Sequence, residues 1–262
     1  MLDKQYRFHG DIMKIVNEFY GGEANGLKLG KPNQNFEKDH GLTVKIGNNT
    51  IVDPDKHIYF VDCDEKESGG DAGSKSLQNE QEANAVIKML SELNKSVGDL
   101  ITLGKIKADK KPSVGVICTY GLQTGLIKKR IKNNKIKYEN FSRKSDEQLI
   151  ISTVDEFQGD ERDIILVSMV RNPRNPRNFN AEFVKKYERI NVAFSRARNM
   201  LMIFGSKRFL SDQWVELPDA SGDDTQSRPV YRNIVTTVEL YGRVISANDI
   251  LPAEPKKSGD NK

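Results

Sequence analysis

Polar loops beside apolar runs are the places where this sequence has residue types suited to chemistry. One such loop, GGDAGSKS at 69–76, lies between an expected strand and an expected helix, where a phosphate-binding loop would lie. That loop needs the pattern G-x-x-x-x-G-K-[ST], in which backbone N–H groups and one lysine surround the phosphates. Ser74 stands in place of the second glycine, and neither Gly-Lys-Ser nor Gly-Lys-Thr occurs in the chain. The sequence therefore predicts an ordinary solvated loop at 69–76.

Acidic residues follow two apolar runs, at 62–65 (DCDE) and at 155–156 (DE). Carboxylates at such places can hold Mg²⁺ and polarise water in an ATPase. With no phosphate-binding loop upstream, neither pair has a nucleotide to serve, so we interpret both as acids that commonly end strands.

Metal-binding and nucleophilic residues are sparse. The three histidines (His9, His40 and His57) are scattered along the sequence, and none stands at ligand spacing from a cysteine. Cys118 lies in an apolar run and is predicted to be a small core residue. We therefore expect no metal site.

Three further segments carry charged residues beside apolar runs. They are QYR at 5–7, STVDEFQGDERDIILVSMVR at 152–171, and ERINVAFSRAR at 188–198, which places Arg196 and Arg198 directly before an apolar run. These segments hold the strongest candidates for a functional site.

Composition limits the class of protein that can hold these residues. Of 262 residues, 37% are hydrophobic, and 41 basic against 37 acidic residues give a net charge of +4. Disorder goes with few apolar groups and a large net charge, so a folded chain is expected. No apolar run approaches the roughly 18 residues of a membrane span, and two cysteines exclude a disulfide framework. We expect a soluble, cytoplasmic protein without a membrane partner.

Apolar runs alternate with helical patterns along most of the chain. Strands are expected at 58–62, 114–120, 148–154, 163–170 and 199–205. Helices are expected at 79–93, 121–134, 188–198 and 230–242, and residues 3–20 have mostly helical spacing that Gly10 can interrupt. Nearly continuous apolar strands between helices predict an α/β fold with a parallel sheet covered on both faces. In such sheets the functional loops gather beyond the carboxyl ends of the strands.

The pattern divides the chain into two parts. We expect one domain over 1–210, with a loop-rich insertion at 21–56 that holds a single short strand, TVKIG. The remainder, 211–262, is expected to hold an acidic linker at 211–228, one helix and a disordered tail.

Four motifs, taken together and in this order, resemble the second RecA-like domain of superfamily 1 helicases, in the branch that includes the RNA helicase of nonsense-mediated mRNA decay. They are QYRFH at 5–9, VICTYGLQ at 116–123, VDEFQGDERD at 154–163 and RINVAFSRAR at 189–198. The first departs from the family's Q-Y-R-M-H-P by Phe8 and Gly10. The family's N-x-x-E-A helix start also fits NEQEA at 79–83. The resemblance spans about residues 1–210 and implies a RecA-like fold of the P-loop NTPase type.

The resemblance implies roles for the charged residues. Arg7 and Arg196 would be arginine fingers, which stabilise charge on a γ-phosphate and are worth about 10³–10⁵ in rate. Gly159 would let the backbone approach that phosphate, because it has no Cβ. Glu161 would contact the nucleotide or sense its phosphate. Gln5 and Arg198 complete the set of expected nucleotide-binding residues, with Arg198 also linking the nucleotide to the nucleic acid.

A surface for single-stranded DNA or RNA follows from the same interpretation. Thr119 and Tyr120 end one strand, and Ser152 and Thr153 end another, where a hydroxyl or ring can meet a nucleic-acid backbone. Between 128 and 144, eight basic residues and one acid give a local charge of +7. That run fits either nonspecific phosphate binding or a solvated helix face.

The family's P-loop and Mg²⁺-binding carboxylates belong to a first RecA-like domain, so ATP and Mg²⁺ would be held mainly by that domain. We therefore expect the C-terminal motor domain of an ATP-dependent helicase or translocase that cannot hydrolyse ATP alone, either as a fragment or as a stand-alone remnant. The alternative is a non-catalytic module, derived from a helicase, that binds nucleic acid or protein. A small-molecule α/β enzyme would need a complete catalytic constellation, which the sequence does not show.

Overall fold

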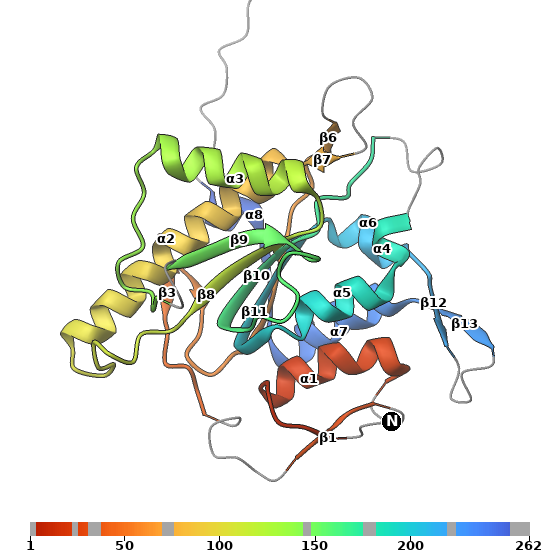
Figure 1. Ribbon diagram of the computed structural model, residues 1–262, viewed down its shortest axis with the longest axis horizontal. Helices are drawn as coiled ribbons and strands as arrows, with labels where there is room; N and C mark the ends of the chain where they lie inside the picture. The colour runs from red at the N-terminus through yellow and green to blue at the C-terminus, as the bar shows by residue number, and fades with distance from the viewer. Residues whose placement is uncertain are drawn as a thin grey trace, which may run out of the picture.

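A six-stranded, wholly parallel sheet forms the centre of the computed structural model (Figure 1). The structure describes residues 4–22, 26–30, 38–69, 76–143, 148–174, 182–218 and 224–251. The strand order is β14-β5-β11-β10-β8-β9, and every neighbouring pair is parallel. The strands are β5 (Ile58–Asp62), β8 (Val114–Cys118), β9 (Leu149–Thr153), β10 (Arg162–Ser168), β11 (Ala197–Gly205) and β14 (Arg243–Ser246).

Helices cover both faces of this sheet because its strands are apolar on both sides. Along β11, Leu201 and Ile203 point into one core, whereas Met200 and Met202 point into the other, as the period of two in a strand requires. The first core is closed by α1 (Gly10–Asn17), α5 (Tyr187–Phe194) and α7 (Val230–Tyr241), and the second by α2 (Glu80–Thr102), α3 (Gly121–Asn133) and α8 (Ala247–Ile250). The predicted RecA-like α/β fold is confirmed.

Two helices differ in extent from their predictions. The helix expected at 79–93 runs on to Thr102, and Asn79 caps it by accepting a hydrogen bond from the Glu82 amide at 3.0 Å. The helix expected at 188–198 ends at Phe194, and β11 begins at Ala197. Arg196 therefore lies in the turn between a helix and a strand, not on a helix.

The N-terminal segment is not one helix. Lys4–Gln5 form a short strand, β1, that pairs with β2 (Lys28–Leu29), and α1 follows from Gly10. The insertion at 21–56 holds more than one strand, because β3 (Val44–Ile46) and β4 (Asn49–Val52) form an antiparallel pair. The region is therefore only partly loop.

The residues after 210 also take part in regular structure. Val215–Pro218 (β12) and Thr225–Arg228 (β13) pair antiparallel, so the prediction of a linker at 211–228 is wrong for these residues. The helix predicted at 230–242 is present as α7. The strand β14 then pairs with β5 and forms one edge of the sheet. The expected tail at 252–262 lies outside the described residues.

The remaining elements are short. They are η1 (Glu18–Tyr20), β6 (Ser68–Gly69), β7 (Leu77–Gln78), α4 (Glu182–Lys185) and α6 (Lys207–Ser211). Among the described residues, no helix combines the length and apolar character that crossing a membrane requires.

Candidate nucleotide site and nucleic-acid surface

Arginines from two distant parts of the chain, Arg7 and Arg198, pair with one carboxylate, that of Glu161. The Nε atom of Arg7 lies 2.9 Å from Glu161 Oε2, and Arg198 pairs with Glu161 Oε1. Arg196 lies in the same cluster, close enough to Arg7 and Glu161 for both charges to act on it. Three guanidinium groups and one carboxylate give the cluster a formal charge of +2 (three minus one).

Gln5 fixes the N-terminal turn that presents Arg7. Its Oε1 accepts hydrogen bonds from the backbone N–H groups of Arg7 (2.8 Å) and Phe8 (3.0 Å), and its Nε2 donates to the Phe8 carbonyl (2.8 Å). Gln5 was predicted to bind nucleotide, but the structure commits both ends of its amide to the backbone of this turn. The turn is tied to β11 by the hydrogen bond from the His9 amide to the Arg198 carbonyl, at 2.8 Å.

Glu161 is positioned by the tight turn that leads into β10. Gly159 has a φ of +90°, a conformation that favours glycine, and a Cβ built there would meet nothing within 4 Å. Next to it, Asp160 Oδ1 lies 2.5 Å from Nη1 of the buried Arg162. The Arg162 amide in turn donates to the Arg196 carbonyl at 3.0 Å. The turn therefore exposes open backbone at Gly159, two residues before Glu161 in the sequence.

Arg196 is partly buried. Burial lowers the pKa of Arg196, and the charge of Arg7 lowers it further, while Glu161 and Asp160 partly offset both effects. Its Nε atom is buried and has no hydrogen-bond partner among the described residues. A buried donor without a partner is costly, so an anion that accepted a hydrogen bond from this guanidinium would remove that cost.

The arginine cluster lies at the amino ends of β10 and β11, since Arg162 pairs with Ala197 where these strands begin. The expectation that the functional loops gather beyond the carboxyl ends is therefore wrong for the arginines. The reason is local: Arg196 and Arg198 flank the first residue of a strand, so they stay at its amino end.

The predicted nucleic-acid residues lie at the opposite end of the sheet, the carboxyl edge, where the strands have their carboxyl ends. Cys118 pairs with Thr153, which places Thr119, Tyr120, Ser152 and Thr153 at neighbouring strand ends, as predicted. Their hydroxyls differ in availability, however. Thr119 is buried, and its Oγ1 donates to the Met169 carbonyl at 2.9 Å.

The other hydroxyls of this edge have different surroundings. Ser152 Oγ is buried and has no hydrogen-bond partner among the described residues. Thr153 is tied to the exposed Glu156: its amide donates to Glu156 Oε2 at 2.9 Å, and that bond lowers the pKa of Glu156. Tyr120 is half-buried, which raises its pKa, and it hydrogen bonds with Arg171. Tyr120 is the aromatic residue of the four, and its ring is partly exposed.

The acidic pairs have partners within the fold. Asp155 pairs with Arg189 of α5 at 2.9 Å, and Asp62 accepts a hydrogen bond from the Lys207 amide at 2.8 Å.

Cys118 is buried, as predicted, and burial raises the pKa of its thiol to about 12. In the part of the chain that the structure describes, no group of three or more His, Cys, Asp or Glu side chains is arranged to hold a metal ion. Most of the 69–76 loop lies outside that part.

The three histidines, scattered in the sequence, are together in space. The rings of His9 and His57 stack with centroids 3.4 Å apart, and His40 meets His57 edge-on at 5.2 Å. Burial, together with the neighbouring rings, lowers the pKa of His9 and of His40 to about 4. Periodicity and spacing gave no signal for this cluster, because its members come from three separate segments.

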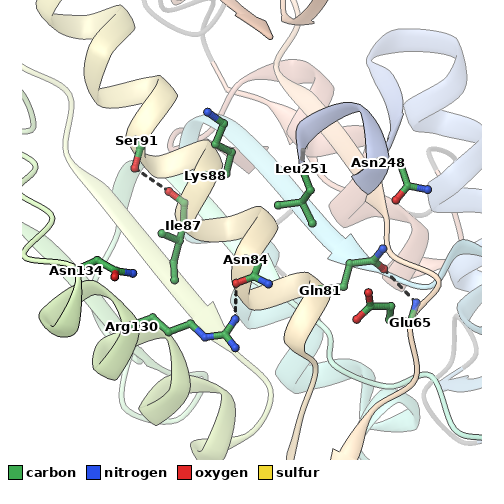
Figure 2. A pocket seen from close by; sticks show the side chains of 10 residues that line it. All are labelled: Glu65, Gln81, Asn84, Ile87, Lys88, Ser91, Arg130, Asn134, Asn248 and Leu251. Atoms are coloured by element: carbon green, nitrogen blue, oxygen red, sulfur yellow. Dashed lines mark hydrogen bonds between the residues drawn. The ribbon is translucent and has the colours of Figure 1, made fainter. Parts of the chain in front are cut away.

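A separate hollow of about 680 Å³ lies between α2, α3 and α8 (Figure 2). Arg130 reaches across it from α3 to hydrogen bond Asn84 of α2. It is lined by Glu65, Gln81, Asn84, Ile87, Lys88, Ser91, Arg130, Asn134, Asn248 and Leu251. None of the predicted site residues lines it.

Comparison with known proteins agrees with the motifs. A family model described as an AAA domain matches residues 1–208. The DNA replication ATP-dependent helicase/nuclease JHS1 of Arabidopsis thaliana is 28% identical over 218 residues, which cover 80% of this chain and 14% of that protein. The helicase sen1 of Schizosaccharomyces pombe is 28% identical over 250 residues, which cover 94% of this chain and 13% of that protein. The chain thus spans less than a fifth of the length of either relative.

The solved structures that this chain resembles include the C-terminal domain of a possible DNA helicase from Lactobacillus plantarum. It has 12% sequence identity and a TM-score of 0.39, and the match covers 77% of this chain and 88% of that chain. The fold assignment rests on the strand order and pairing described above, not on this likeness.

A six-stranded parallel sheet covered by helices on both faces is the architecture of a RecA-like domain, and the matching family model and relatives show that this domain is helicase-related. The chain belongs to the AAA domain family. Its resemblance to superfamily 1 helicases, predicted from the motifs, is confirmed.

Proposed function

We propose that this chain is the second, C-terminal RecA-like motor domain of an ATP-dependent helicase or translocase. It supplies arginine fingers to a nucleotide and part of the track for single-stranded DNA or RNA. The observation that carries the proposal is the pairing of Arg7 and Arg198 with Glu161, with the partly buried Arg196 near enough for the charges of Arg7 and Glu161 to act on it.

The residues of this cluster fit a polyphosphate. The Arg196 guanidinium is desolvated and its buried Nε lacks a partner among the described residues, so a phosphate oxygen would satisfy it. The backbone at Gly159 leaves room where a Cβ would otherwise stand. Bound ATP, with its Mg²⁺, supplies the phosphoryl group that is transferred to water. The role of Arg7 and Arg196 is to stabilise the negative charge that develops on the phosphate oxygens, and arginine suits it because it stays charged.

Glu161 and Arg198 act beside the two fingers. Glu161 neutralises part of the cationic cluster and holds Arg7 and Arg198 in place when no phosphate is bound. An incoming anion competes with this carboxylate for the guanidinium groups, which makes Glu161 a sensor of the phosphate. Gln5 contributes by shaping the turn that carries Arg7, so we reassign it from a nucleotide contact to a positioning residue.

The sequence has no P-loop, so the phosphates and Mg²⁺ would be held mainly by a first RecA-like domain that carries one. We expect ATP binding to bring the two domains together and hydrolysis to release them, moving the chain along single-stranded nucleic acid. The nucleic-acid residues Thr119, Tyr120, Ser152 and Thr153 would contact the strand at the carboxyl edge, away from the arginines.

The test is ATP hydrolysis with and without single-stranded oligonucleotide. We expect the purified 262-residue chain to show only background hydrolysis, and the same chain joined to its P-loop domain to show hydrolysis that the oligonucleotide stimulates. Hydrolysis by the chain alone would refute the proposal that a first RecA-like domain must supply the P-loop. Oligonucleotide binding by the joined protein without any hydrolysis would favour the alternative, a non-catalytic binding module derived from a helicase.

A further inference from the structure

Glu82 is a fully buried carboxyl group that the proposed mechanism does not use. It lies in the first turn of α2, under the carboxyl ends of β8 and β10. Its Oε2 accepts hydrogen bonds from Ser168 Oγ (2.6 Å) and from the Val170 amide (2.9 Å). Its Oε1 is buried and has no hydrogen-bond partner among the described residues. Such a group needs a reason to be retained, because burying a carboxyl group is costly.

Val170, whose backbone amide donates a hydrogen bond to Glu82, has a strained backbone. Its φ is +67°, and the Arg171 amide donates to the Met169 carbonyl at 2.7 Å, so Val170 is the centre of a γ-turn. A β-branched residue with positive φ is an outlier that costs about 1–3 kcal/mol and persists only where the surroundings impose it. The hydrogen bond from the Val170 amide to Glu82 is part of what imposes it.

The γ-turn sets the direction in which the chain continues to Arg171. Directly after the turn, Arg171 Nη1 pairs with Glu67 Oε1 at 3.0 Å, and both side chains are only 10% exposed. Arg171 also hydrogen bonds with Tyr120, the half-buried ring at the carboxyl edge. A line of contacts therefore runs from the Glu82 carboxyl through the backbone of Val170 and the Arg171 guanidinium to Tyr120.

We propose that Glu82 is a positioning residue for the nucleic-acid surface: by holding the γ-turn at Val170, it sets Arg171 in the place from which that side chain orients Tyr120 to stack against a base of a single strand. This inference rests on the proposed function for the surface itself. Glu82 does not touch the strand, and its effect passes through the turn.

The protonation of Glu82 gives the inference a measurable signature. Burial raises the pKa of Glu82, the hydrogen bonds from Ser168 and Val170 lower it, and the charge of Glu67 raises it again, so that the pKa is about 8. The other titratable groups that face it are Cys63 and Cys118, whose pKa values burial also raises, that of Cys118 to about 12. Glu82 is therefore neutral near pH 7 and ionises towards pH 9, where its charge would lie beneath a surface that binds phosphates.

The experiment measures binding of a fluorescein-labelled single-stranded oligo(dT), and of its oligo(rU) counterpart, to the 262-residue chain between pH 6.5 and 9. For the wild type we expect affinity to fall by about tenfold as Glu82 ionises, the equivalent of one pKa unit of coupling. Glu82→Gln mimics the neutral acid, so it should bind like the wild type at pH 7 and keep that affinity at pH 9. Glu82→Ala should weaken binding by about tenfold at every pH, similar to Tyr120→Ala, which removes one stacking ring. Glu92→Gln, on the partly exposed face of the same helix, is the matched control and should follow the wild type.

The outcomes separate the two proposals. If the wild type binds, Tyr120→Ala weakens binding and Glu82→Gln removes the pH dependence, the positioning role is supported, even if Glu82→Ala does not fold. If Tyr120→Ala weakens binding but Glu82→Gln follows the wild-type pH profile, the positioning role is refuted and the surface stands. If the wild type does not bind, or Tyr120→Ala binds as tightly as the wild type, the proposed surface and the role of Glu82 both fail.

Discussion

The side chains of Arg7 and Glu161 are joined by an ion pair with an Nε–Oε2 distance of 2.9 Å. The pair connects the N-terminal turn to the turn that begins β10, two segments that are far apart in the sequence. A second contact supports it, because Arg7 Nη1 lies 3.5 Å from the Ser195 carbonyl, one residue before Arg196. The two proposed fingers are therefore held on the same side of the sheet before any nucleotide is bound.

Replacing Arg196 tests the finger role directly. In the chain joined to its P-loop domain, Arg196→Ala should lower oligonucleotide-stimulated ATP hydrolysis by about 10³-fold or more, because the charge that stabilises the γ-phosphate is lost. Arg196→Lys should restore little of the rate, since lysine lacks the fork of donors. Steady-state hydrolysis assays measure this, with the exposed Arg208→Ala as the control. A variant with the wild-type rate would exclude Arg196 from the site.

Replacing Gln5 tests its structural role. Gln5→Ala removes three hydrogen bonds and leaves the amides of Arg7 and Phe8 without their acceptor. We expect a loss of about 1–3 kcal/mol in the free energy of unfolding, measured by urea denaturation. We also expect faster proteolysis of the N-terminal segment. Lys95→Ala, at an exposed position of α2, should change neither quantity. If Gln5→Ala is as stable as the wild type and loses only nucleotide affinity, Gln5 is a nucleotide contact after all.

The histidine cluster predicts sensitivity to acid. The pKa of His9 is lowered to about 4, from 6.5, chiefly by burial and then by His57. The unfolded chain therefore binds the proton more readily, and stability should be lost as the pH falls from about 6.5 to about 4. His9→Phe keeps a ring to stack on His57 but cannot take up a proton. Its loss of stability between pH 7.5 and pH 5, from urea midpoints, should be smaller than that of the wild type. An equal loss in both proteins would show that other groups govern the acid transition.

The buried Glu82 predicts an effect of the opposite sign. Its pKa is raised to about 8, from 4.5, by burial, so the folded chain holds the proton more tightly than the unfolded chain. Its contribution to stability is complete below about pH 4.5 and should be lost as the pH rises towards 8. Glu82→Gln removes this dependence, so the difference in unfolding free energy between variant and wild type should grow between pH 5 and pH 8. Thermal and urea unfolding at several pH values would measure it, and a constant difference would contradict the burial of a titrating group.

The strands and the arginine motifs were predictable because each is encoded locally. Continuous apolar runs gave β5, β8, β10 and β11, and an arginine on each side of Ala197 placed charge beside a strand. The packing of segments distant in sequence was not predictable in the same way. The clustering of His9 with His57, and the use of the Gln5 amide by its own turn, depend on tertiary contacts that periodicity does not encode. The γ-turn at Val170 was missed for a different reason, because valine is among the residues least suited to positive φ.

The pairing of β14 with β5 limits where the chain can be truncated for recombinant production. Recombinant versions that end near residue 208, where the match to the family model ends, would lose α7 and β14 together. They would leave one side of β5 with unpaired N–H and C=O groups next to an uncovered apolar layer, a combination that promotes self-association. Poor solubility of such a shortened version would therefore reflect a missing sheet edge and would say nothing about whether the motor itself is competent.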